Sequence, residues 1–388
     1  MANHKQKQIR IAMVTGVLGK GGAEKQLFYI ISAMIRLNFQ LKVFTLTQGE
    51  YYENKLSELG VECIWIGKSP FPIWRLGVLL IEMIRFRPRI MYSTHFYGNI
   101  YSGLIGRILG ILSIGSIRND LALELKKNGF WGRWLIKLPH VLIANSQQAV
   151  SQLISIGEHS KKIFVLQNFI DLSEFDHLAK MKINPPGKND KLKIILVARL
   201  VEQKRIDRFI EIIASLCKKH DNILGIIVGD GPEMENLQQI KIKLNLSQSQ
   251  LLFWGQEENI PALLKQCDLL VLTSEHEGFP NVILEGMAAN LPIVTSDVGD
   301  SKKIVIDGLS GFVIAGDNNS GFEEKIELLL ASKDIREKMG NAGRKIVENE
   351  FNISKIDEIL LNVLIQIAEM CGKKELVIQL KICREDHN

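Results

Sequence analysis

Residues 9–47, IRIAMVTGVLGKGGAEKQLFYIISAMIRLNFQLKVFTLT, contain the pattern that decides the fold. A short run of strand-forming residues (9–16) leads through a glycine-rich turn into an amphipathic stretch (21–37), and a second apolar run (40–47) follows. Short β-branched runs that alternate with longer amphipathic stretches are typical of βαβ units. We therefore expect parallel strands with helices on both faces of the sheet.

The same alternation continues through both halves of the chain. In the first half the further strand candidates are 89–94, 111–118, 141–146 and 162–168. The segment INPPGKNDK (183–191) then concentrates turn-forming residues, which makes 185–190 the best linker candidate. After it the strand candidates are 193–198, 223–229, 251–254, 268–272 and 292–295.

This repetition predicts two Rossmann-like, doubly wound α/β domains that face a central cleft. A chain of 388 residues is longer than one hydrophobic core usually supports. We expect a first domain at 1–184, a second at 191–350, and a helical segment at 351–388 that could pack on either domain, including back on the first. Open α/β sheets bind ligands beyond the carboxyl ends of their strands, so candidate functional residues are sought there.

The composition excludes several classes of protein. With 46% hydrophobic and 23% charged residues, the chain is ordinary for a globular enzyme and has no disordered segment. A net charge of +5 with interspersed acidic residues does not indicate a nucleic-acid partner. The five cysteines are scattered without zinc-site spacing, so we expect reduced, mostly buried thiols.

Membrane association is left open by the sequence. No apolar run reaches the roughly eighteen residues of a spanning helix, and the N-terminal one is too short for a secretory signal, so we expect a cytoplasmic protein. The stretch KKNGFWGRWLIKLPH (126–140) interleaves basic and aromatic residues, and 71–89 is similar. Such stretches fit the headgroup layer of an anionic membrane or an ordinary amphipathic helix, so peripheral attachment to the cytoplasmic face of the membrane is one hypothesis.

Two loops at strand ends could bind phosphate. Gly21 and Gly22 precede the helix that begins near Ala23, and a helix start with free backbone N–H groups favours an anion. The spacing is not that of a dinucleotide fingerprint, so a plain tight turn is the alternative. In ARLVEQKRID (198–207), Arg199 and Lys204 could clamp a diphosphate. The alternative is a solvated basic loop in which Arg205 and Arg208 add further surface charge.

The segment HEGFPNVILEGMAANLPIVTSDVGD (276–300) places carboxylates on both sides of a helix start. Glu277 lies just before the helix and Glu285 about one turn inside it, while Pro280 fixes the backbone at the helix entrance. Carboxylates accept hydrogen bonds from sugar hydroxyls, and a helix start near two cations suits a phosphate. A nucleotide diphosphate sugar is one ligand that needs both chemistries.

These motifs resemble those of the retaining glycosyltransferases of family four, glycosyl transferases group 1, which have the GT-B fold. The segment 276–300 is similar to the E-x7-E signature of that family, ARLVEQKRID to its R-L-x-x-x-K element, and GKGGAEKQL (19–27) to its N-terminal glycine loop. The likeness covers nearly the whole chain. One departure is Phe169 in VLQNFID, where the family usually has glycine after asparagine.

The resemblance implies a role for each matching residue. Glu277 would orient the donor sugar, Glu285 would bind the ribose, and Arg199 and Lys204 would neutralise the diphosphate as it leaves. Backbone groups of the segment Gly278, Phe279, Pro280 and Asn281 would lie near the sugar and the distal phosphate, and Gly21 and Gly22 would contact the phosphates from the opposite domain. The family needs no metal and no cofactor, and the departing phosphate itself serves as the base.

Three further residues follow strands of the first half. His95, in IMYSTHFYGN (90–99), resembles the family's cleft histidine near the donor sugar, although a lone histidine is more often structural. Arg118 and Asp120 could bind an acceptor hydroxyl or phosphate, or form an ion pair with each other. Asn145 and Ser146 fit a helix N-cap.

The expected function is that of a hexosyl- or N-acetylhexosaminyltransferase. It would move a sugar from a nucleotide diphosphate sugar, with UDP as the expected nucleotide, to a glycan or lipid-linked glycan in bacterial surface polysaccharide synthesis. A nicotinamide-dependent oxidoreductase would need a dinucleotide fingerprint, which the chain lacks, and a GT-B epimerase or phosphorylase should lack the paired glutamates and cations. A non-catalytic sugar-nucleotide-binding or scaffold subunit of a glycan-assembly complex is the alternative from a different class.

Overall fold

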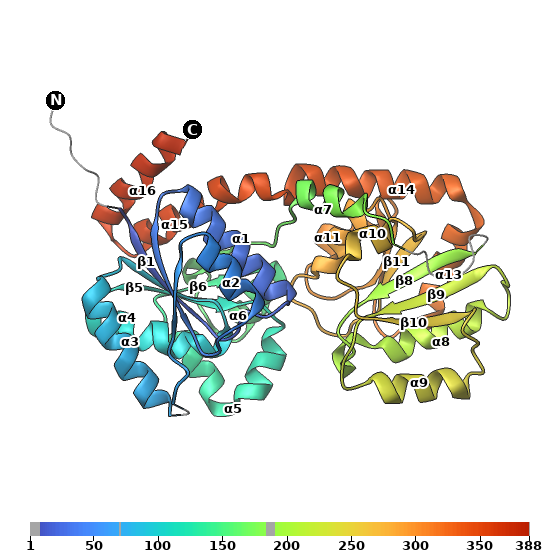
Figure 1. Ribbon diagram of the computed structural model, residues 1–388, viewed down its shortest axis with the longest axis horizontal. Helices are drawn as coiled ribbons and strands as arrows, with labels where there is room; N and C mark the ends of the chain where they lie inside the picture. Colours follow the sequence, from blue (N-terminus) through green and yellow to red (C-terminus); the bar gives the residue numbers. More distant parts are fainter. Residues whose placement is uncertain (1–7, 70, 184–190, 388) are drawn as a thin grey trace. The chain divides into compact units, whose positions relative to one another are not determined.

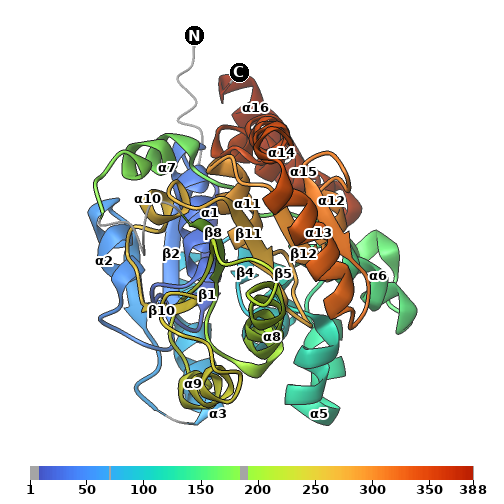
Figure 2. The same cartoon turned by 90° about the vertical axis from the view of Figure 1, so that its right-hand side faces the viewer.

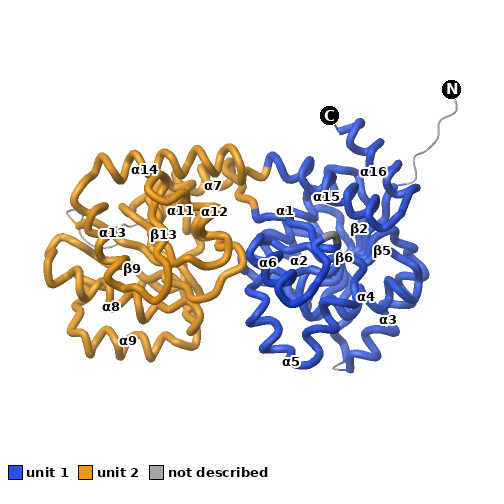
Figure 3. Tube along the Cα trace, turned by 180° about the vertical axis from the view of Figure 1, so that it is seen from behind, with its two compact units in different colours: residues 1–168, 354–388 blue, residues 169–353 orange. Residues whose placement is uncertain are grey.

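The computed structural model describes residues 8–69, 71–183 and 191–387. The chain folds into two compact units, which Figure 3 colours separately. Unit 1 consists of residues 1–168 and 354–388, and unit 2 of residues 169–353. Each unit is an open parallel sheet covered by helices, as the sequence predicts (Figure 1).

Unit 1 contains a seven-stranded sheet in the order β3-β2-β1-β4-β5-β6-β7, and every neighbouring pair is parallel. The strands are β1 (Arg10–Thr15), β2 (Gln40–Thr45), β3 (Glu62–Trp65), β4 (Ile90–Ser93), β5 (Leu112–Ile117), β6 (Val141–Ala144) and β7 (Ile163–Val165). The central strands β4, β5 and β6 are buried along their whole length. This explains why they read as continuous apolar runs in the sequence.

The helices of unit 1 bury one apolar stripe each and leave the opposite side in solvent. Leu79 and Met83 of α3 join Tyr101 and Ile105 of α4 in one buried cluster against the sheet. A second cluster joins α5 and α6 to the neighbouring strands. The helices are α1 (Gly22–Arg36), α2 (Tyr51–Glu58), α3 (Pro72–Phe86), α4 (Asn99–Leu109), α5 (Leu121–Lys137), α6 (Gln147–Ser155), α15 (Ile356–Met370) and α16 (Lys374–His387).

Unit 2 contains a six-stranded parallel sheet in the order β10-β9-β8-β11-β12-β13. Successive residues of β8 point to opposite faces, because Ile194 joins one buried cluster and Ile195 the other. The strands are β8 (Leu192–Val197), β9 (Ile223–Val228), β10 (Leu251–Gly255), β11 (Leu269–Leu272), β12 (Ile293–Ser296) and β13 (Gly311–Ile314).

Helices cover both faces of this second sheet (Figure 2). One cluster packs α8, α9, α13 and α14 on the sheet, and the other packs α7, α10 and α11. The helices are α7 (Leu172–Ala179), α8 (Ile206–Leu216), α9 (Met234–Lys243), α10 (Ile260–Leu264), α11 (Asn281–Ala288), α12 (Ser301–Ile304), α13 (Asn319–Ala331) and α14 (Lys333–Ile346).

The division of the chain differs from the predicted one. The expected linker at 185–190 lies outside the described residues, and unit 2 already begins at Phe169, which is buried. The chain enters unit 2 early because Ile170 hydrogen-bonds through its backbone with Phe351 and Ile353, and because Phe175 of α7 packs in the core of unit 2. Two edge strands, β3 and β13, were not predicted from the sequence. Each has only four residues, which is too short for a clear periodic signal.

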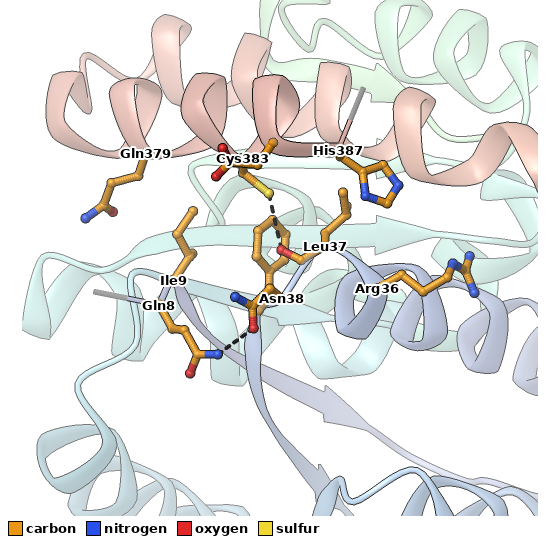
Figure 4. Close-up of a pocket in the computed structure, with 10 residues that line it drawn as sticks. Gln8, Ile9, Arg36, Leu37, Asn38, Gln379, Cys383 and His387 are labelled. Atoms are coloured by element: carbon orange, nitrogen blue, oxygen red, sulfur yellow. Dashed lines mark hydrogen bonds between the residues drawn. The ribbon is translucent and has the colours of Figure 1, made fainter. Parts of the chain in front are cut away.

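The C-terminal segment belongs to unit 1 from Ser354 onward. Arg36 at the end of α1 makes a two-pronged ion pair with Asp357 of α15, at 2.6 and 2.8 Å. On α16, the Cys383 thiol lies 3.2 Å from the Leu37 carbonyl oxygen at the rim of a cavity of about 180 Å³ (Figure 4). A helical C-terminal segment that returns to the first unit was one of the two predicted arrangements.

Three predicted absences concern the described residues only. No helix there is long and apolar enough to cross a membrane. No group of three or more histidine, cysteine or carboxylate side chains in that part of the chain is placed to hold a metal ion. The five cysteines are free, and each is only partly exposed, which agrees with the expectation of mostly buried thiols. Burial raises the pKa of the Cys267 thiol to about 12.

Replacing Leu380 by alanine tests the attachment of α16 to unit 1. Leu380 is fully buried, so its truncation should lower the free energy of unfolding by about 2–5 kcal/mol. The matched control is Ile378→Ala on the same helix, because Ile378 is 61% exposed, and it should change stability by less than about 0.5 kcal/mol. Urea unfolding followed by tryptophan fluorescence measures both. Equal stabilities of the two variants would contradict the packing of α16 described above.

Candidate active site

The order of the strands reverses once in each sheet. In unit 2, β8 lies between β9 and β11, and in unit 1, β1 lies between β2 and β4. The chain leaves the two strands at such a point in opposite directions, so their loops diverge and leave room for a ligand beyond the carboxyl ends. The loops after β8 and β11 carry Arg199, Lys204 and Glu277, and those after β1 and β4 carry the glycine loop and His95.

Lys204 and Glu277 form an ion pair at the reversal point of unit 2. The Lys204 Nζ atom lies 2.5 Å from Glu277 Oε1, although 73 residues separate them in the sequence. Both side chains are largely buried, with 20% and 10% of their areas exposed. The pair is therefore partly shielded from solvent, which strengthens the attraction between the two charges.

Hydrogen bonds fix the two loops that carry this pair. The Ser274 hydroxyl donates to Glu277 Oε1 at 2.7 Å, and the Thr273 hydroxyl donates to the Lys204 and Arg205 carbonyl oxygens at 3.1 and 2.8 Å. The backbone N–H of Glu275 donates to the Gln203 carbonyl at 2.8 Å. Neither charged side chain needs to be ordered by a ligand, because the loops already hold both.

The segment from Gly278 to Asn281 leads directly into α11. Pro280 is the N-cap residue and Asn281 the first helical residue. Phe279 is buried edge-to-face against Phe351, with ring centroids 5.7 Å apart. Glu285 lies in the second turn and is partly exposed. The positive end of the α11 dipole therefore lies beside the Lys204–Glu277 pair.

Gly299, in the loop after β12, lies close to the backbone of this segment. Its φ of +55° is one that side-chain-bearing residues rarely adopt, and a Cβ there would lie 2.3 Å from the Gly278 carbonyl oxygen. The Asp300 backbone N–H donates to the same carbonyl at 3.1 Å. Glycine at position 299 thus permits the close approach of the two loops, a constraint that the sequence alone does not reveal.

Arg199 is exposed two residues beyond the end of β8. The loop that carries it runs close to the neighbouring loop after β9, because a Cβ on Gly229 would lie 1.9 Å from the Ala198 carbonyl oxygen and one on Gly231 would lie 2.3 Å from that of Leu200. These glycines are therefore architectural.

Arg208 is a cation that the sequence analysis placed on the surface, and that alternative is wrong. Its residue exposure is 4% because it lies on the buried side of the amphipathic helix α8. It forms an ion pair with Asp317, which follows β13. Burial and the charge of Arg205 lower the pKa of Arg208. Arg208 occupies an apolar position of the helical period, and this signal could have predicted its burial.

His95 lies at the reversal point of unit 1. Its Nδ1 atom accepts a hydrogen bond from the Gly16 backbone N–H at 3.3 Å, and the Thr15 and Thr94 hydroxyls lie 3.3 and 3.1 Å away. Because the N–H can only donate, Nδ1 accepts and the imidazole proton lies on Nε2. Nε2 faces Glu24 Oε1 of α1 at 3.7 Å.

Three residues that the sequence analysis did not single out surround this histidine. The Tyr97 ring stacks on His95, with centroids 5.4 Å apart. Partial burial and the carboxylates of Glu24 and Glu124 raise the pKa of Tyr97 to about 12. Burial also raises the pKa of Glu124, against the opposing charge of Lys127. Glu24 lies within the motif GKGGAEKQL, so it could have been found from its place in the first turn of the helix, two residues after Gly22.

The glycines of the first loop differ in role. Gly21 is the N-cap residue of α1, and Gly22 is the exposed first residue of that helix. Gly16 is structural, because a Cβ there would overlap the Tyr97 hydroxyl group. The start of α1 therefore offers an accessible, positively polarised helix end.

Arg118 and Asp120 have separate roles rather than forming a pair. Asp120 is the N-cap residue of α5: one carboxylate oxygen accepts from the Leu123 N–H at 3.1 Å, and the other accepts from the Gln152 side-chain amide at 2.9 Å. Arg118 has a long contact of 3.5 Å with the Tyr92 hydroxyl, and its buried Nε has no hydrogen-bond partner among the residues that the structure describes. Arg118 is thus the better acceptor-side candidate. Ser146 caps α6 as predicted.

Two family models match the chain, one to each half. The model for "Glycosyltransferase Family 4" matches residues 20–174, and the model for "Glycosyl transferases group 1" matches residues 180–346. The first match lies almost wholly in unit 1 and the second lies in unit 2, and together they cover both candidate clusters.

Curated relatives are similar over part of their length. The N-acetyl-alpha-D-glucosaminyl L-malate synthase of Bacillus anthracis is 26% identical over 226 residues, which is 58% of this chain and 59% of the relative. The capsular polysaccharide biosynthesis glycosyltransferase CapM of Staphylococcus aureus is 30% identical over 181 residues, 44% of this chain and 45% of the relative. The chain thus spans about half the length of the curated relatives that it matches.

Solved structures show the same fold over almost the whole chain. HepE of Anabaena, solved in complex with UDP-glucose, superposes with a TM-score of 0.79 at 20% identity and covers 94% of this chain and 100% of its own. A variant of TarM of S. aureus, solved in complex with UDP among other ligands, gives a TM-score of 0.73 at 14% identity and covers 92% and 99%. The two Rossmann-like units therefore have the GT-B fold.

The loop after β12 can be tested by replacing Gly299 with alanine. The substitution should lower the free energy of unfolding by about 1–3 kcal/mol more than the strain of a positive φ alone would. The additional loss arises because the new methyl group would overlap the Gly278 carbonyl oxygen. Gly316→Ala supplies the control: its φ of +67° carries the same penalty, but nothing lies within 4 Å of a Cβ there. Urea denaturation of the full chain compares the two. Identical losses would show that the loops are not in close contact.

Proposed function

The chain belongs to the family 4 glycosyltransferases, and we propose that it transfers a sugar from a nucleotide diphosphate donor to a hydroxyl group of a glycan acceptor. The observation that carries the proposal is the Lys204–Glu277 pair at the strand-order reversal of unit 2. It brings a cation for phosphate and a carboxylate for sugar hydroxyls within one hydrogen bond of each other.

The donor diphosphate is proposed to bind Lys204 and Arg199 near the start of α11. Lys204 is then shared between two anions, Glu277 and the phosphate, while Arg199 offers a fork of donors that suits two phosphate oxygens. Backbone groups from Gly278 to Asn281 support the distal phosphate. The nucleotide is proposed to be UDP, in keeping with the UDP-glucose bound by HepE.

Glu277 is proposed to hold the donor sugar. Its Oε1 atom already accepts from Lys204 and Ser274, so the carboxylate is oriented before any ligand arrives. Sugar hydroxyls can donate to its remaining lone pairs. Glu285, partly exposed in the second turn of α11, is proposed to accept hydrogen bonds from the ribose hydroxyls.

Unit 1 is proposed to carry substrate-binding residues of its own. Gly21 and Gly22 are proposed to bind phosphate at the start of α1. His95, whose Nε2 atom faces Glu24, is proposed to donate a hydrogen bond from that atom to a sugar or acceptor hydroxyl. Arg118 contributes a cation to the acceptor side. Asp120 serves this site by capping α5, so it acts through the helix rather than on the substrate.

The chemistry is proposed to retain the configuration of the sugar. The bond between the anomeric carbon and the diphosphate oxygen breaks as Lys204 and Arg199 stabilise the negative charge on the leaving group. The acceptor oxygen then attacks the same face, and its proton passes to the departing phosphate. No protein carboxylate needs to act as the base, and no metal is required, because the cations stabilise the charge that develops.

The acceptor is proposed to be a lipid-linked or surface glycan reached at a membrane. Exposed apolar residues gather on α3 and α5, where Trp74 is 60%, Ile81 is 52% and Trp131 is 68% exposed. Exposed Lys126 and Arg133 lie on α5 among them. Aromatic and basic side chains together suit an anionic headgroup layer. The capsular role in the name of CapM is consistent with this substrate class.

Replacing Lys204 by alanine tests the donor assignment. The variant should lose about 100- to 1,000-fold in kcat/KM for sugar transfer, because one donor to a developing negative charge is removed. It should also lose most of the increase in Tm that the nucleotide sugar gives the wild type. The measurement is a thermal-shift and transfer screen with UDP-, GDP- and ADP-sugars.

The control for this variant is Lys219→Ala. Lys219 also pairs with a glutamate, Glu327, at 2.7 Å, but it lies between α8 and β9, which places it away from the carboxyl ends of the strands. The Lys219→Ala variant should transfer sugar at the wild-type rate. Equal thermal shifts in the wild type and Lys204→Ala would contradict the diphosphate assignment. Tight nucleotide-sugar binding without turnover of any donor would instead favour the non-catalytic subunit.

Replacing Trp74 and Trp131 together by serine tests the membrane proposal. Binding to vesicles that contain phosphatidylglycerol should fall by about tenfold or more, since two aromatic side chains leave the interface. Ile242→Ser on α9 of unit 2, where the isoleucine is 65% exposed, should bind as the wild type does. Co-sedimentation measures all three proteins. Undiminished binding of the double variant would rule out this face as the attachment site.

A further inference from the structure

A second cavity lies at the other edge of the unit 1 sheet. Its volume is about 580 Å³. Arg10 begins β1, Arg89 precedes β4 and Ile111 precedes β5, so these lining residues mark the amino ends of the strands. The glycine loop and His95 follow the carboxyl ends of the same strands. The cavity is therefore separate from the candidate active site.

The lining of this cavity is strongly basic. Five of its residues are cations and one is a carboxylate, namely Arg10, Arg87, Arg89, Lys373, Lys374 and Glu375. Glu375 is already engaged, because its Oε1 atom lies 2.7 Å from Arg89 Nη2. Among the described residues, no carboxylate lies within ion-pairing distance of the other four cations. The cavity thus holds a positive charge that the chain itself does not balance.

Part of this charge acts on a neighbouring histidine. The pKa of His140 is lowered by burial and then by the positive charges of Arg107 and Lys373. Lys373 also donates a hydrogen bond to the Gly110 carbonyl oxygen at 3.1 Å, which fixes its ammonium group at the cavity wall. The first turn of α16, a helix of 14 residues, begins at Lys374 and lines the same space. Its positive dipole end adds to the field.

Arg87 occupies a backbone position that normally favours glycine. It follows α3 with φ 52° and ψ 56°, the left-handed conformation of a helix C-cap. Glycine is the usual residue there because it has no Cβ to strain. Arginine at this position lowers the local stability but places a cation at the mouth of the cavity.

The remaining walls of the cavity are apolar. Met83, Ile84, Leu109, Ile111 and Leu376 line it together with the cations. Ile84 is 55% exposed and lies on the apolar side of α3 that also carries Ile81. The cavity therefore combines a cationic lining with an apolar one, which matches a ligand that carries a phosphate at one end and a hydrocarbon group at the other.

We propose that this cavity is a second ligand site, which binds the phosphate group of an ester with an apolar substituent. Arg10 and Arg87 offer planar forks to phosphate oxygens, and Lys373 and Lys374 add compact charges. The apolar walls accept the substituent. Two sources have this chemistry: the headgroup of an anionic lipid, and a soluble phosphorylated compound. The proposal does not depend on sugar transfer by the same chain.

The test uses the full-length protein and the charge-reversal double variant Arg87→Glu/Lys374→Glu. Both side chains are exposed, so the fold should tolerate the changes. The matched control is Lys338→Glu/Lys345→Glu, which alters the net charge equally at exposed positions of α14 in unit 2. Calorimetric titration uses decyl phosphate below its micellar concentration, inorganic phosphate, and decyl maltoside as a ligand of similar chain length without phosphate.

The wild type and the control should bind decyl phosphate with equal affinity, and the double variant should bind at least about tenfold more weakly, as expected when hydrogen bonds to a charged group are lost. Decyl phosphate should bind more tightly than inorganic phosphate. Unchanged affinity in the double variant, equal binding of decyl maltoside, or no binding of decyl phosphate would overturn the proposal.

A vesicle experiment then distinguishes the two sources. Vesicles of phosphatidylcholine with and without phosphatidic acid are sedimented with each protein. A gain in binding with phosphatidic acid that the double variant lacks and the control keeps identifies a lipid headgroup as the ligand. Loss of decyl phosphate binding in the double variant without any such difference on vesicles identifies a soluble phosphorylated compound. Both results support a phosphate site in this cavity.

Discussion

The hydrogen-bonded ion pair between Lys204 and Glu277 is the interaction on which the candidate site depends. It exists because β8 and β11 are neighbours in the sheet while the chain leaves them in opposite directions. The loops after these strands therefore meet over the reversal point, and the hydroxyl groups of Thr273 and Ser274 fix them there. A cation and a carboxylate held in this way can each bind a different part of one ligand. Unit 1 has the same arrangement at its own strand-order reversal, where the loops after β1 and β4 bring Gly16 and His95 into contact. Each sheet thus supplies one polar cluster at its carboxyl edge, while the cation-lined cavity occupies the amino edge of unit 1.

Much of this architecture was predictable because the signals are local. Buried parallel strands such as β5 and β9 read as apolar runs, and amphipathic helices such as α1 and α8 follow them with a clear period. The edge strands β3 and β13 escaped prediction because four residues give too little pattern. The crossing into unit 2 at Phe169 escaped it because the backbone partners of Ile170 lie near residue 352, far away in the sequence. The turn-forming residues at 185–190 carry no information about that contact.

The sequence motifs predict several residues of the candidate site but not the contacts between them. Sequence motifs located Lys204 and Glu277, yet nothing local shows that they touch across 73 residues. The same limit applies to Asp120, whose two oxygens are used by Leu123 and Gln152, the latter on a different helix. Glu24, Tyr97 and Glu124 gain their importance only from proximity to His95. Spacing along the chain therefore identifies candidates, and the three-dimensional contacts show which of them lie together.

The central claim is that Glu277 and Lys204 bind different parts of the donor. The most direct test measures the affinities of Glu277→Gln and Lys204→Ala for UDP and UDP-glucose. If Glu277 holds the sugar and Lys204 the diphosphate, Glu277→Gln should weaken binding of UDP-glucose while leaving UDP bound as tightly as before or more tightly, because Lys204 loses its competing anion. Lys204→Ala should weaken both ligands. An equal loss of UDP and UDP-glucose affinity in Glu277→Gln would contradict the account.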